Sequence, residues 1–523
     1  MPALAKRLGT GSALFSKSLE KYSMLFPMTR ASLLLATMLA LSACGGGGDS
    51  GQTPPPVAVT PLTTVSGIAA AGAPLQGTII IKDGFNNLKA TGIKADGSFS
   101  FDVSQMKAPF MLRAQGDANG TSYVLHAAAT DADGNGHFNV TPLSELIVAR
   151  AVGQSPAQFY AAANFSQLGK TQLDQQEAAL QARIQPLLDA AKVPSSVDLR
   201  RQVFAADLTG LDAVLEAVEV SIDADNKQFT LRNRLNGATL SDGLQGSQGS
   251  STLKADADSS EALEAVAASV QLMKEHLSLS EFTQGQEILA LLHPDYLSYG
   301  VTKADEAKNL EYFASTTNSD HDRSIKRTLA GYQIQGFKDG VLTLTLDITE
   351  RSSMKAENNA DLRIVDIQFK RNAAGKWLLL WNQYPASFTH VGLDNASTTA
   401  CFESCKYMAF ELYGSTFNKI QETVAYAVAK GPGLPEGGVR ATYTPSRFTS
   451  GEGRWVFDTV KTNSVMNPDG SFQLNTHVLW IKMDVAKAQM GKWPVYALEV
   501  FDRTGKLIYI EREVPRIPVV PRT

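Results

Sequence analysis

The chain has 523 residues, 44% of them hydrophobic and 19% charged, and a formal net charge of −4 at pH 7. At about 150 residues per domain, this length allows several domains, each with a core of its own. The composition is that of an ordinary globular protein, and its slightly acidic balance gives no reason to expect nucleic-acid binding, which depends on basic surfaces.

The first 43 residues are expected to be a targeting segment rather than part of the fold. Arg30 precedes a mostly apolar run from Ala31 to Leu41. This run is too short to cross a bilayer permanently as a helix, but it suits the hydrophobic part of a secretory signal peptide. Because such a signal normally lies at the start of a chain, translation from Met24 or Met28 is an alternative to translation from the first methionine.

The segment Leu41-Ser42-Ala43-Cys44-Gly45 closes this run and resembles the lipobox of bacterial lipoproteins. The resemblance implies that the signal is cut before Cys44 and that this cysteine carries the lipid. Gly45, in place of aspartate, is similar to the outer-membrane sorting pattern of Gram-negative lipoproteins. The expected location is therefore the bacterial cell envelope, on the periplasmic or surface face of the outer membrane, with the lipid on Cys44 as the membrane anchor. An ordinary signal peptide with an incidental cysteine is the alternative.

Residues 44–62 follow the lipobox and differ in composition from the rest of the chain. They contain a run of glycines and the triplet Pro54-Pro55-Pro56, with few large apolar side chains. This composition predicts a flexible tether between the membrane and the first domain.

Residues 63–141 predict short antiparallel strands. Asp96-Gly97 is a hairpin turn signal, and Phe99, Phe101 and Val103 alternate after it. With Val65-Ser66-Gly67 before it, this segment resembles the carboxypeptidase-regulatory-like, or transthyretin-like, β-sandwich. That family implies a module without catalytic activity.

The end of this segment resembles the first half of a calcium loop. Asp131, Asp133 and Asn135 stand at its first, third and fifth positions, and a glycine stands at the sixth. The second half does not fit, because position twelve is Pro142 rather than a glutamate. The three residues are therefore only weak candidates for a metal site, with a glycine-rich turn as the alternative, and no cofactor is expected.

Residues 142–235 are predicted to be helical and to end in a hairpin. Ser155-Pro156 is a helix-start signal, and apolar residues at helical spacing follow from Leu173. A further helix is predicted after Thr209, and strands on either side of Asp225-Asn226 form the hairpin. Residues 236–259 are rich in Gly, Ser, Gln and Asp, which predicts a flexible linker and a domain boundary.

Residues 260–392 combine helices with long strands. Leu263, Val266 and Val270 recur at helical spacing, Ser280 is expected to cap a second helix, and strands begin at Arg327. Helices followed by a curved antiparallel sheet resemble the cone-shaped α+β fold of the nuclear-transport-factor and ketosteroid-isomerase superfamily. The resemblance implies a sheet wrapped around a pocket for a small molecule.

Five side chains are expected near the mouth of that pocket: His293, Asp295, Tyr296, Tyr299 and Trp381. The superfamily's enzymes imply a histidine or carboxylate as general base, opposed by a hydrogen-bond donor. The alternative is structural, with His293 at the end of a helix and Trp381 in the core. An open pocket with an acid/base pair would favour an enzyme, whereas a pocket filled by its own side chains would favour a scaffold.

Residues 393–523 predict six or seven strands with glycine and proline turns, which indicates a second β-sandwich. Cys401 and Cys405 are expected to form a disulfide in an oxidising envelope, because two thiolates alone cannot fill the four ligand positions of zinc. Four aromatic residues could form a sugar-binding face, with burial as the alternative: Tyr443, Trp455, Trp480 and Trp493.

The predicted fold class is therefore a multidomain α+β protein: a β-sandwich, a helical segment with a hairpin, a cone-shaped α+β domain and a C-terminal β-sandwich. The chain contains no G-x-S-x-G, no H-E-x-x-H and no phosphate-binding glycine loop. We therefore expect a non-enzymatic, lipid-anchored envelope protein whose modules bind a protein, a glycan or a small ligand. The alternative is a lipid-anchored enzyme or apolar-ligand carrier that uses the cavity of residues 260–392.

Overall fold

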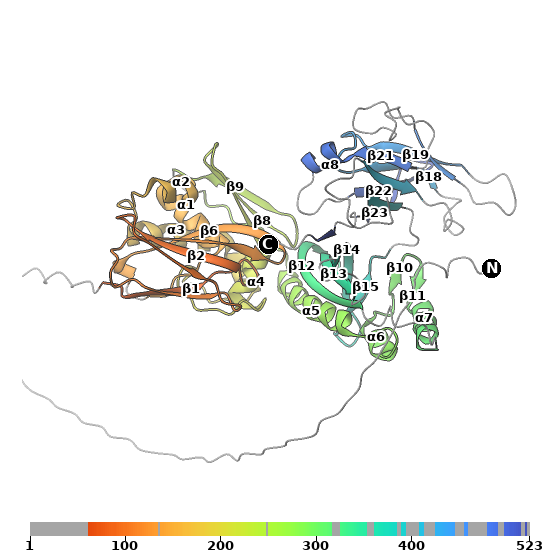
Figure 1. Ribbon diagram of the computed structural model, residues 1–523, viewed down its shortest axis with the longest axis horizontal. Helices are drawn as coiled ribbons and strands as arrows, with labels where there is room; N and C mark the ends of the chain where they lie inside the picture. The colour runs from red at the N-terminus through yellow and green to blue at the C-terminus, as the bar shows by residue number, and fades with distance from the viewer. Residues whose placement is uncertain are drawn as a thin grey trace, which may run out of the picture.

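Three hydrophobic cores organise the chain in a computed structural model, shown in Figure 1. The structure describes residues 61–133, 136–246, 249–315, 325–352, 360–383, 389–393, 407–412, 424–444, 454–458, 478–489, 496–513 and 518–519. The paired strands are antiparallel, and helices and sheets both contribute to the largest core, so the fold is mixed α/β with mostly antiparallel sheets. None of the helices in this described part has the length and apolar character that a membrane crossing needs.

Two sheets enclose the core of the first unit, in a sandwich-like arrangement. One has the order β3-β2-β5-β6, and the other pairs β1 with β4. The predicted alternation holds, because Phe99 and Phe101 are buried between exposed neighbours. Asp96 accepts a hydrogen bond from the main-chain N of Ser98 (2.9 Å), which fixes the predicted turn. The strands are β1 (Thr64–Ile68), β2 (Gln76–Asp83), β3 (Leu88–Gly92), β4 (Ser98–Asp102), β5 (Phe110–Ala118) and β6 (Thr121–Ala129).

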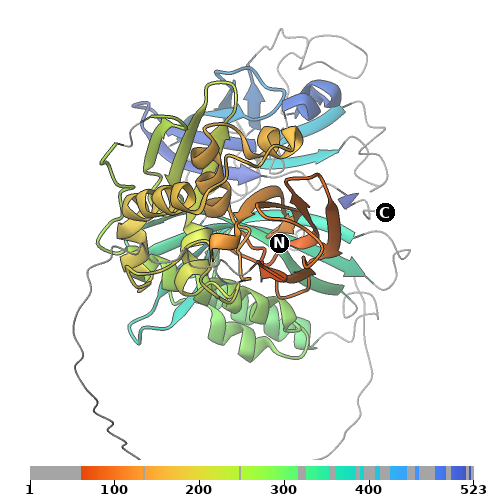
Figure 2. The same cartoon turned by 90° about the vertical axis from the view of Figure 1, so that its left-hand side faces the viewer.

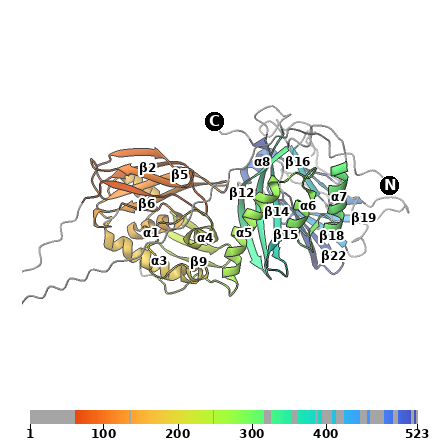
Figure 3. The ribbon, with the colours of Figure 1, turned by 90° about the horizontal axis from the view of Figure 1, so that it is seen from below.

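Helix α1 packs against β6, and three further helices follow it, of which α2 and α3 contact α1 and α4 contacts α3 (Figure 3). A small three-stranded sheet comes next. Thr141 caps α1 reciprocally with Ser144, Pro142 occupies the first helical position, and Gly153 ends the helix with a positive φ of 64°. The predicted hairpin is confirmed as β7 and β8. The elements are α1 (Pro142–Val152), α2 (Pro156–Ala162), α3 (Lys170–Ala190), α4 (Gly210–Ala217), β7 (Val218–Asp223), β8 (Gln228–Asn233) and β9 (Thr239–Gly243).

The segment 236–259 differs from the flexible linker that its composition predicts. It contains β9, which pairs with β8 and places Leu240 opposite Leu231. Leu244 and Leu253 are buried in the same core. Because that core also contains helix α5 and the following sheet, residues 142–235 and 260–392 are not separated by a free linker but share one hydrophobic interior.

A long antiparallel sheet follows, and α5 lies along one face of it (Figure 1). Its order is β12-β13-β14-β15, with β24 added beside β14. The predicted apolar stripe of α5 is buried, including Leu263, Val266 and Val270. The helix predicted at Ser280 begins later, at Gly285. The elements are α5 (Ser259–Ser278), α6 (Gly285–Leu291), β10 (Leu297–Ser298), β11 (Val301–Thr302), α7 (Lys303–Ser315), β12 (Ile325–Lys338), β13 (Val341–Ser352), β14 (Ala360–Arg371), β15 (Trp377–Trp381) and β24 (Pro518–Val519).

Two further sheets, coloured blue at the top of Figure 2, share the last core. Their orders are β16-β17-β21 and β20-β19-β18-β22-β23. Trp455 is buried in this core, so it does not contribute to a sugar-binding face. The elements are β16 (Thr389–Leu393), β17 (Tyr407–Leu412), β18 (Val424–Lys430), β19 (Val439–Thr444), β20 (Arg454–Phe457), β21 (Val478–Lys482), α8 (Met483–Gln489), β22 (Tyr496–Asp502) and β23 (Leu507–Glu513).

The first unit contacts the long sheet where the β5–β6 turn meets β12. A Cβ added at Gly331 would lie 2.5 Å from the main-chain O of Asn119, which cannot swing aside as a side chain can. We expect Gly331→Ala to lower the free energy of unfolding by about 1–3 kcal/mol through overpacking. Gly92→Ala, in open space on β3, is the matched control. Urea unfolding that shows equal losses for both variants would contradict this contact.

Candidate functional site

A groove of about 330 Å³ lies between the edges of two sheets. One wall is β6, from Thr121 to Leu125, and the other is β7, from Val218 to Ile222. Among the described strands, β6 pairs only with β5, and β7 pairs only with β8. The start of α1 and the end of α4 close the groove, so unpaired strand edges face each other across an open hollow.

The main chain of β6 turns alternate polar groups into this groove. The N–H of His126 faces away from β5, because it donates to the side chain of Glu145, and the O of His126 accepts from Ser144. In an antiparallel pair the outward direction repeats at every second residue. The N–H and C=O of Val124 therefore also face away from β5, and the Val124 side chain is 44% exposed.

Arg234, which lines the groove, has two carboxyl groups beside it. Arg234 lies 3.9 Å from a carboxylate oxygen of Glu216 and 3.8 Å from one of Glu219. Burial raises the pKa of the Tyr123 hydroxyl, although Arg234 opposes this shift. The groove thus combines paired charges, apolar side chains and main-chain groups, rather than presenting one strong charge to a ligand.

Two carboxyl groups of α4 lie behind this arginine. Asp212 and Glu216 are both buried, four residues apart on one helix. Burial raises the pKa of each to about 7, although Arg234 opposes the shift at Glu216. The side-chain N of Asn119 donates to Glu216 over 3.1 Å, and Tyr332 of β12 lies beside the same carboxyl.

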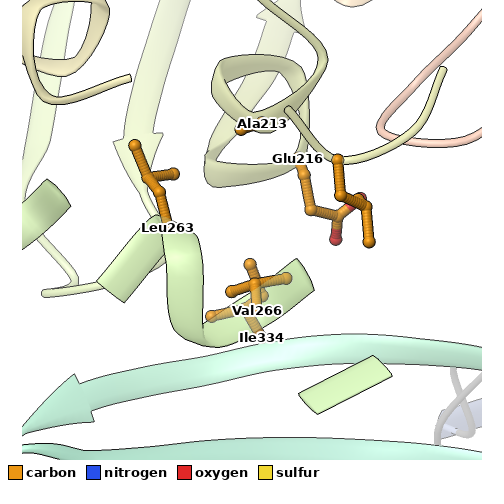
Figure 4. Close-up of a pocket in the computed structure, with 6 residues that line it drawn as sticks. Ala213, Glu216, Leu263, Val266 and Ile334 are labelled. Carbon is orange, nitrogen blue, oxygen red and sulfur yellow. The ribbon is translucent and has the colours of Figure 1, made fainter. Parts of the chain in front are cut away.

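This carboxyl pair is enclosed by protein. Figure 4 shows Glu216 of α4 and Leu263 of α5 on opposite sides, with Val266 of α5 and Ile334 of β12 below them. The seam between these residues has no space for a water molecule. Groups with pKa values near neutrality are typical of acid/base sites, but a substrate could not reach this pair without an opening of the seam.

The residues expected at a pocket mouth do lie together, at the end of β15. The His293 N donates to the O of Leu379 over 2.8 Å, and its ring Nδ1 accepts from the N of Asp295 over 3.0 Å. The His293 side chain is buried, whereas that of Asp295 is 67% exposed and lies 3.7 Å from Lys370. The histidine thus fixes a turn, and the aspartate is a surface group.

The aromatic members of the expected pocket pack against one another. The Trp381 ring centroid lies 6.0 Å from that of Tyr296 and 5.7 Å from that of His276. Burial raises the pKa of Tyr296 and lowers that of His276 to about 4, so this imidazole is neutral at pH 7. The N of Tyr299 donates to the side chain of Asn382 over 3.4 Å. Side chains of the protein itself, Tyr296 and His276, thus pack against Trp381.

The carboxylates of the possible calcium loop have protein partners. Asp131 accepts from the N of Leu62 over 3.1 Å, and Asp133 accepts from both the N and the hydroxyl of Thr130 over 2.8 Å. Asp133 also pairs with Arg200 at 3.2 Å. Within the described residues, no group of three or more metal-ligating side chains comes together. Asn135 lies outside them.

The remaining predicted site residues also lie outside the described part of the chain. They are the lipid-attachment residue Cys44 and the pair Cys401 and Cys405. Their expected roles stay predictions. Trp493 of the possible sugar-binding face lies outside it as well.

Sequence reasoning missed both the groove and the buried acids. The spacing of Asp212 and Glu216 is visible in the sequence, but acidic residues at that spacing normally mark a solvated helix face. Their partners, Asn119 and Tyr332, are more than ninety residues away on either side. The groove depends on which strands end their sheets, which no local pattern reveals.

Comparison with protein-family models, with curated proteins and with solved structures gave no match for this chain.

Proposed function

We propose that this protein is a non-enzymatic lipoprotein of the bacterial cell envelope, anchored through Cys44, and that its groove binds an extended segment of another envelope protein. The observation that carries the binding role is the open hollow between two unpaired strand edges. A peptide strand that binds along β6 would form hydrogen bonds with the outward N–H and C=O of Val124. Main-chain pairing of this kind is how a peptide adds a strand to an exposed sheet edge.

The chemistry of the groove favours a polypeptide over an apolar ligand. Its walls mix main-chain groups, polar side chains and apolar side chains, and Arg234 is neutralised by Glu216 and Glu219. Alternate side chains of an added strand would point into and out of the hollow. Main-chain pairing would supply affinity, and contacts with Tyr123 and Val220 would supply selectivity.

The scaffold role is supported by the packing in residues 260–392. The order α5, α6, β10, β11, α7 and β12 to β15 supports the proposed likeness to the cone-shaped superfamily. Tyr296, Trp381 and His276 contact one another at the expected pocket mouth, and Trp377 and Leu379 are buried in the core. Packing of this kind supports the proposal of a scaffold over an enzyme or carrier.

The anchor is tested by metabolic labelling with a radioactive fatty acid. We expect label on the wild-type chain and its recovery in the membrane fraction, and we expect both to be lost in Cys44→Ser. Unchanged labelling and fractionation of Cys44→Ser would overturn the lipoprotein proposal.

The groove is tested by placing a photo-cross-linking benzoylphenylalanine at Val124 in cells, with Tyr312 as an exposed control site. The cross-linked segment, identified by mass spectrometry and synthesised, should bind the purified chain. Val124→Pro removes the outward N–H without touching the ladder to β5, and should weaken that binding at least tenfold. Equal binding by Val124→Pro, or the same adducts at Tyr312, would contradict strand addition.

A further inference from the structure

Two large apolar side chains are exposed at the tip of the β2–β3 hairpin. Phe85 is 70% exposed and Leu88 is 57% exposed. Apolar side chains left in water forgo the free energy that burial gives, and exposed pairs of this kind often mark contact surfaces. The tip is therefore suited to an apolar surrounding that the chain itself does not provide.

The hairpin tip is held rigidly by one buried carboxylate. Asp83 accepts hydrogen bonds from the N of Phe85 (2.9 Å), the N of Asn87 (2.8 Å) and the N of Lys107 (3.2 Å). Burial alone would raise the pKa of Asp83, but these bonds hold it below its usual value. The apolar tip is thus presented in a fixed conformation, and Lys107 is fixed beside it.

Two lysines flank the apolar pair. The Lys107 ammonium lies 5.5 Å from the centre of the Phe85 ring, and the Lys89 ammonium donates to the O of Asp102 over 2.5 Å. Long lysine stems can lie along an apolar surface while their charged ends stay in water. The exposed Asp102 offsets part of their charge, so the two apolar side chains carry the larger share of the contact.

This tip lies at the end of the unit where the chain arrives from the expected anchor. Thr64, at the start of β1, is paired with Asp102, and the N of Val103 donates to the O of Thr63 over 2.9 Å. Lys89 reaches the same Asp102 from the hairpin. The point of attachment of the tether and the apolar tip are therefore neighbours on one end of the first unit.

A tether of the predicted length would keep this end near the membrane. Leu62 is eighteen residues after Cys44. A flexible chain of that length has a root-mean-square span of about 25 Å, although it could stretch to about 60 Å. A surface contact that is weak on its own becomes effective when the tether holds it this close to its target.

We propose that Phe85 and Leu88, with Lys89 and Lys107 beside them, dock on the surface of the bilayer in which Cys44 is anchored. The phenyl and leucyl side chains enter the boundary between headgroups and acyl chains, and the lysines remain at headgroup level. Docking would fix the orientation of the first unit against the membrane. This inference rests on the proposed lipid anchor.

The test uses residues 44–523 carrying Cys44→Ser, so that no acyl chain contributes, and flotation with vesicles of phosphatidylcholine alone or with phosphatidylglycerol. We expect measurable binding to both, stronger on the anionic vesicles. Phe85→Ser/Leu88→Ser should lower the partition coefficient about tenfold or more on both. Lys89→Gln/Lys107→Gln should lower the partition coefficient mainly on the anionic vesicles, by up to about fivefold per lysine.

The matched control is Tyr312→Ser on α7, which removes a 60% exposed aromatic side chain remote from the hairpin. It should leave the partition coefficient unchanged. Absence of vesicle binding by the Cys44→Ser chain, or equal partition of the hairpin variant and the control, would overturn the docking face. Fatty-acid labelling of the wild type reports the anchor separately, so failure of the anchor and failure of the face are distinguishable.

Discussion

We expect the unfolding free energy of Asp212→Asn, minus that of the wild type, to be about 4 kcal/mol higher at pH 8 than at pH 4. The Asp212 side chain is fully buried, and burial raises its pKa from 3.8 to about 7. A shift of about three units corresponds to about 4 kcal/mol. Urea unfolding of both proteins at several pH values measures this difference.

The sign follows from the direction of the shift. Below pH 4 the carboxyl is protonated in both the folded and the unfolded chain, so its ionisation costs nothing. Between about pH 4 and pH 7 the unfolded chain loses this proton while the folded chain keeps it, and the wild type loses stability as pH rises. The asparagine has no proton to lose, so the variant escapes this loss.

The change with pH in the stability difference between Asp212→Asn and the wild type reports burial more directly than the stability difference at one pH. The hydrogen bonds of Asp212 explain why. The N of Leu208 donates to one oxygen of Asp212 over 2.7 Å, and an asparagine oxygen can replace this acceptor. The other oxygen has no hydrogen-bond partner among the described residues, so the new amide N–H would be unsatisfied at a cost of about 1–3 kcal/mol at every pH. Asp225→Asn, at an exposed hairpin turn, is the control. A pH-independent difference for Asp212→Asn would contradict the burial of an ionisable group.

Helix α4 shows how far sequence reasoning reaches. Its apolar stripe and its start after Thr209 were predictable, because helical spacing and a capping residue are local signals. The fate of its other face was not. Asp212 is fully buried, Glu216 is covered by α5, β12 and the β5–β6 turn, and Gly72 approaches so closely that an added Cβ would lie 1.8 Å from a Glu216 oxygen. Such cover comes from distant parts of the chain.

The segment 236–259 shows the opposite error. Glycine, serine and glutamine indicated a loop, and most of the segment is irregular, but Leu240, Leu244 and Leu253 anchor it in the core. Three leucines in a polar segment are a weak periodic signal, and the register with β8 accounts for the burial of Leu240 alone. The expected pocket residues illustrate a third case. Tyr296 and Trp381 are in ring contact and His293 bonds to the main chain of β15, but the sequence could not show whether space for a ligand remained between these side chains.

Arg200→Met should lower the free energy of unfolding by about 3–5 kcal/mol at pH 7, because it leaves the buried Glu177 carboxylate without its cation and leaves Asp133 with only Arg201, at 3.6 Å. The Arg200 side chain is 3% exposed and lies 2.9 Å from Glu177 and 3.2 Å from Asp133. The Asp133 side chain is fully buried and that of Glu177 is 9% exposed, so water cannot replace the guanidinium. Burial already raises the pKa of Glu177 despite the arginine, and removal of the arginine should raise it further.

The loss should therefore shrink as pH falls, since protonated carboxyls no longer need a cation. Adding Asp133→Asn and Glu177→Gln to Arg200→Met should recover part of the stability at pH 7 and remove its pH dependence. Lys192→Ala breaks the pair between Lys192 and Glu264, whose side chains are 76% and 51% exposed, and should cost no more than about 1 kcal/mol. If Arg200→Met costs as little as Lys192→Ala, then Asp133 and Glu177 must be solvated in the folded protein. In that case the loop at Asp131 to Asp133 would be open to a cation after all, and the reason for assigning its carboxylates to protein partners would be lost.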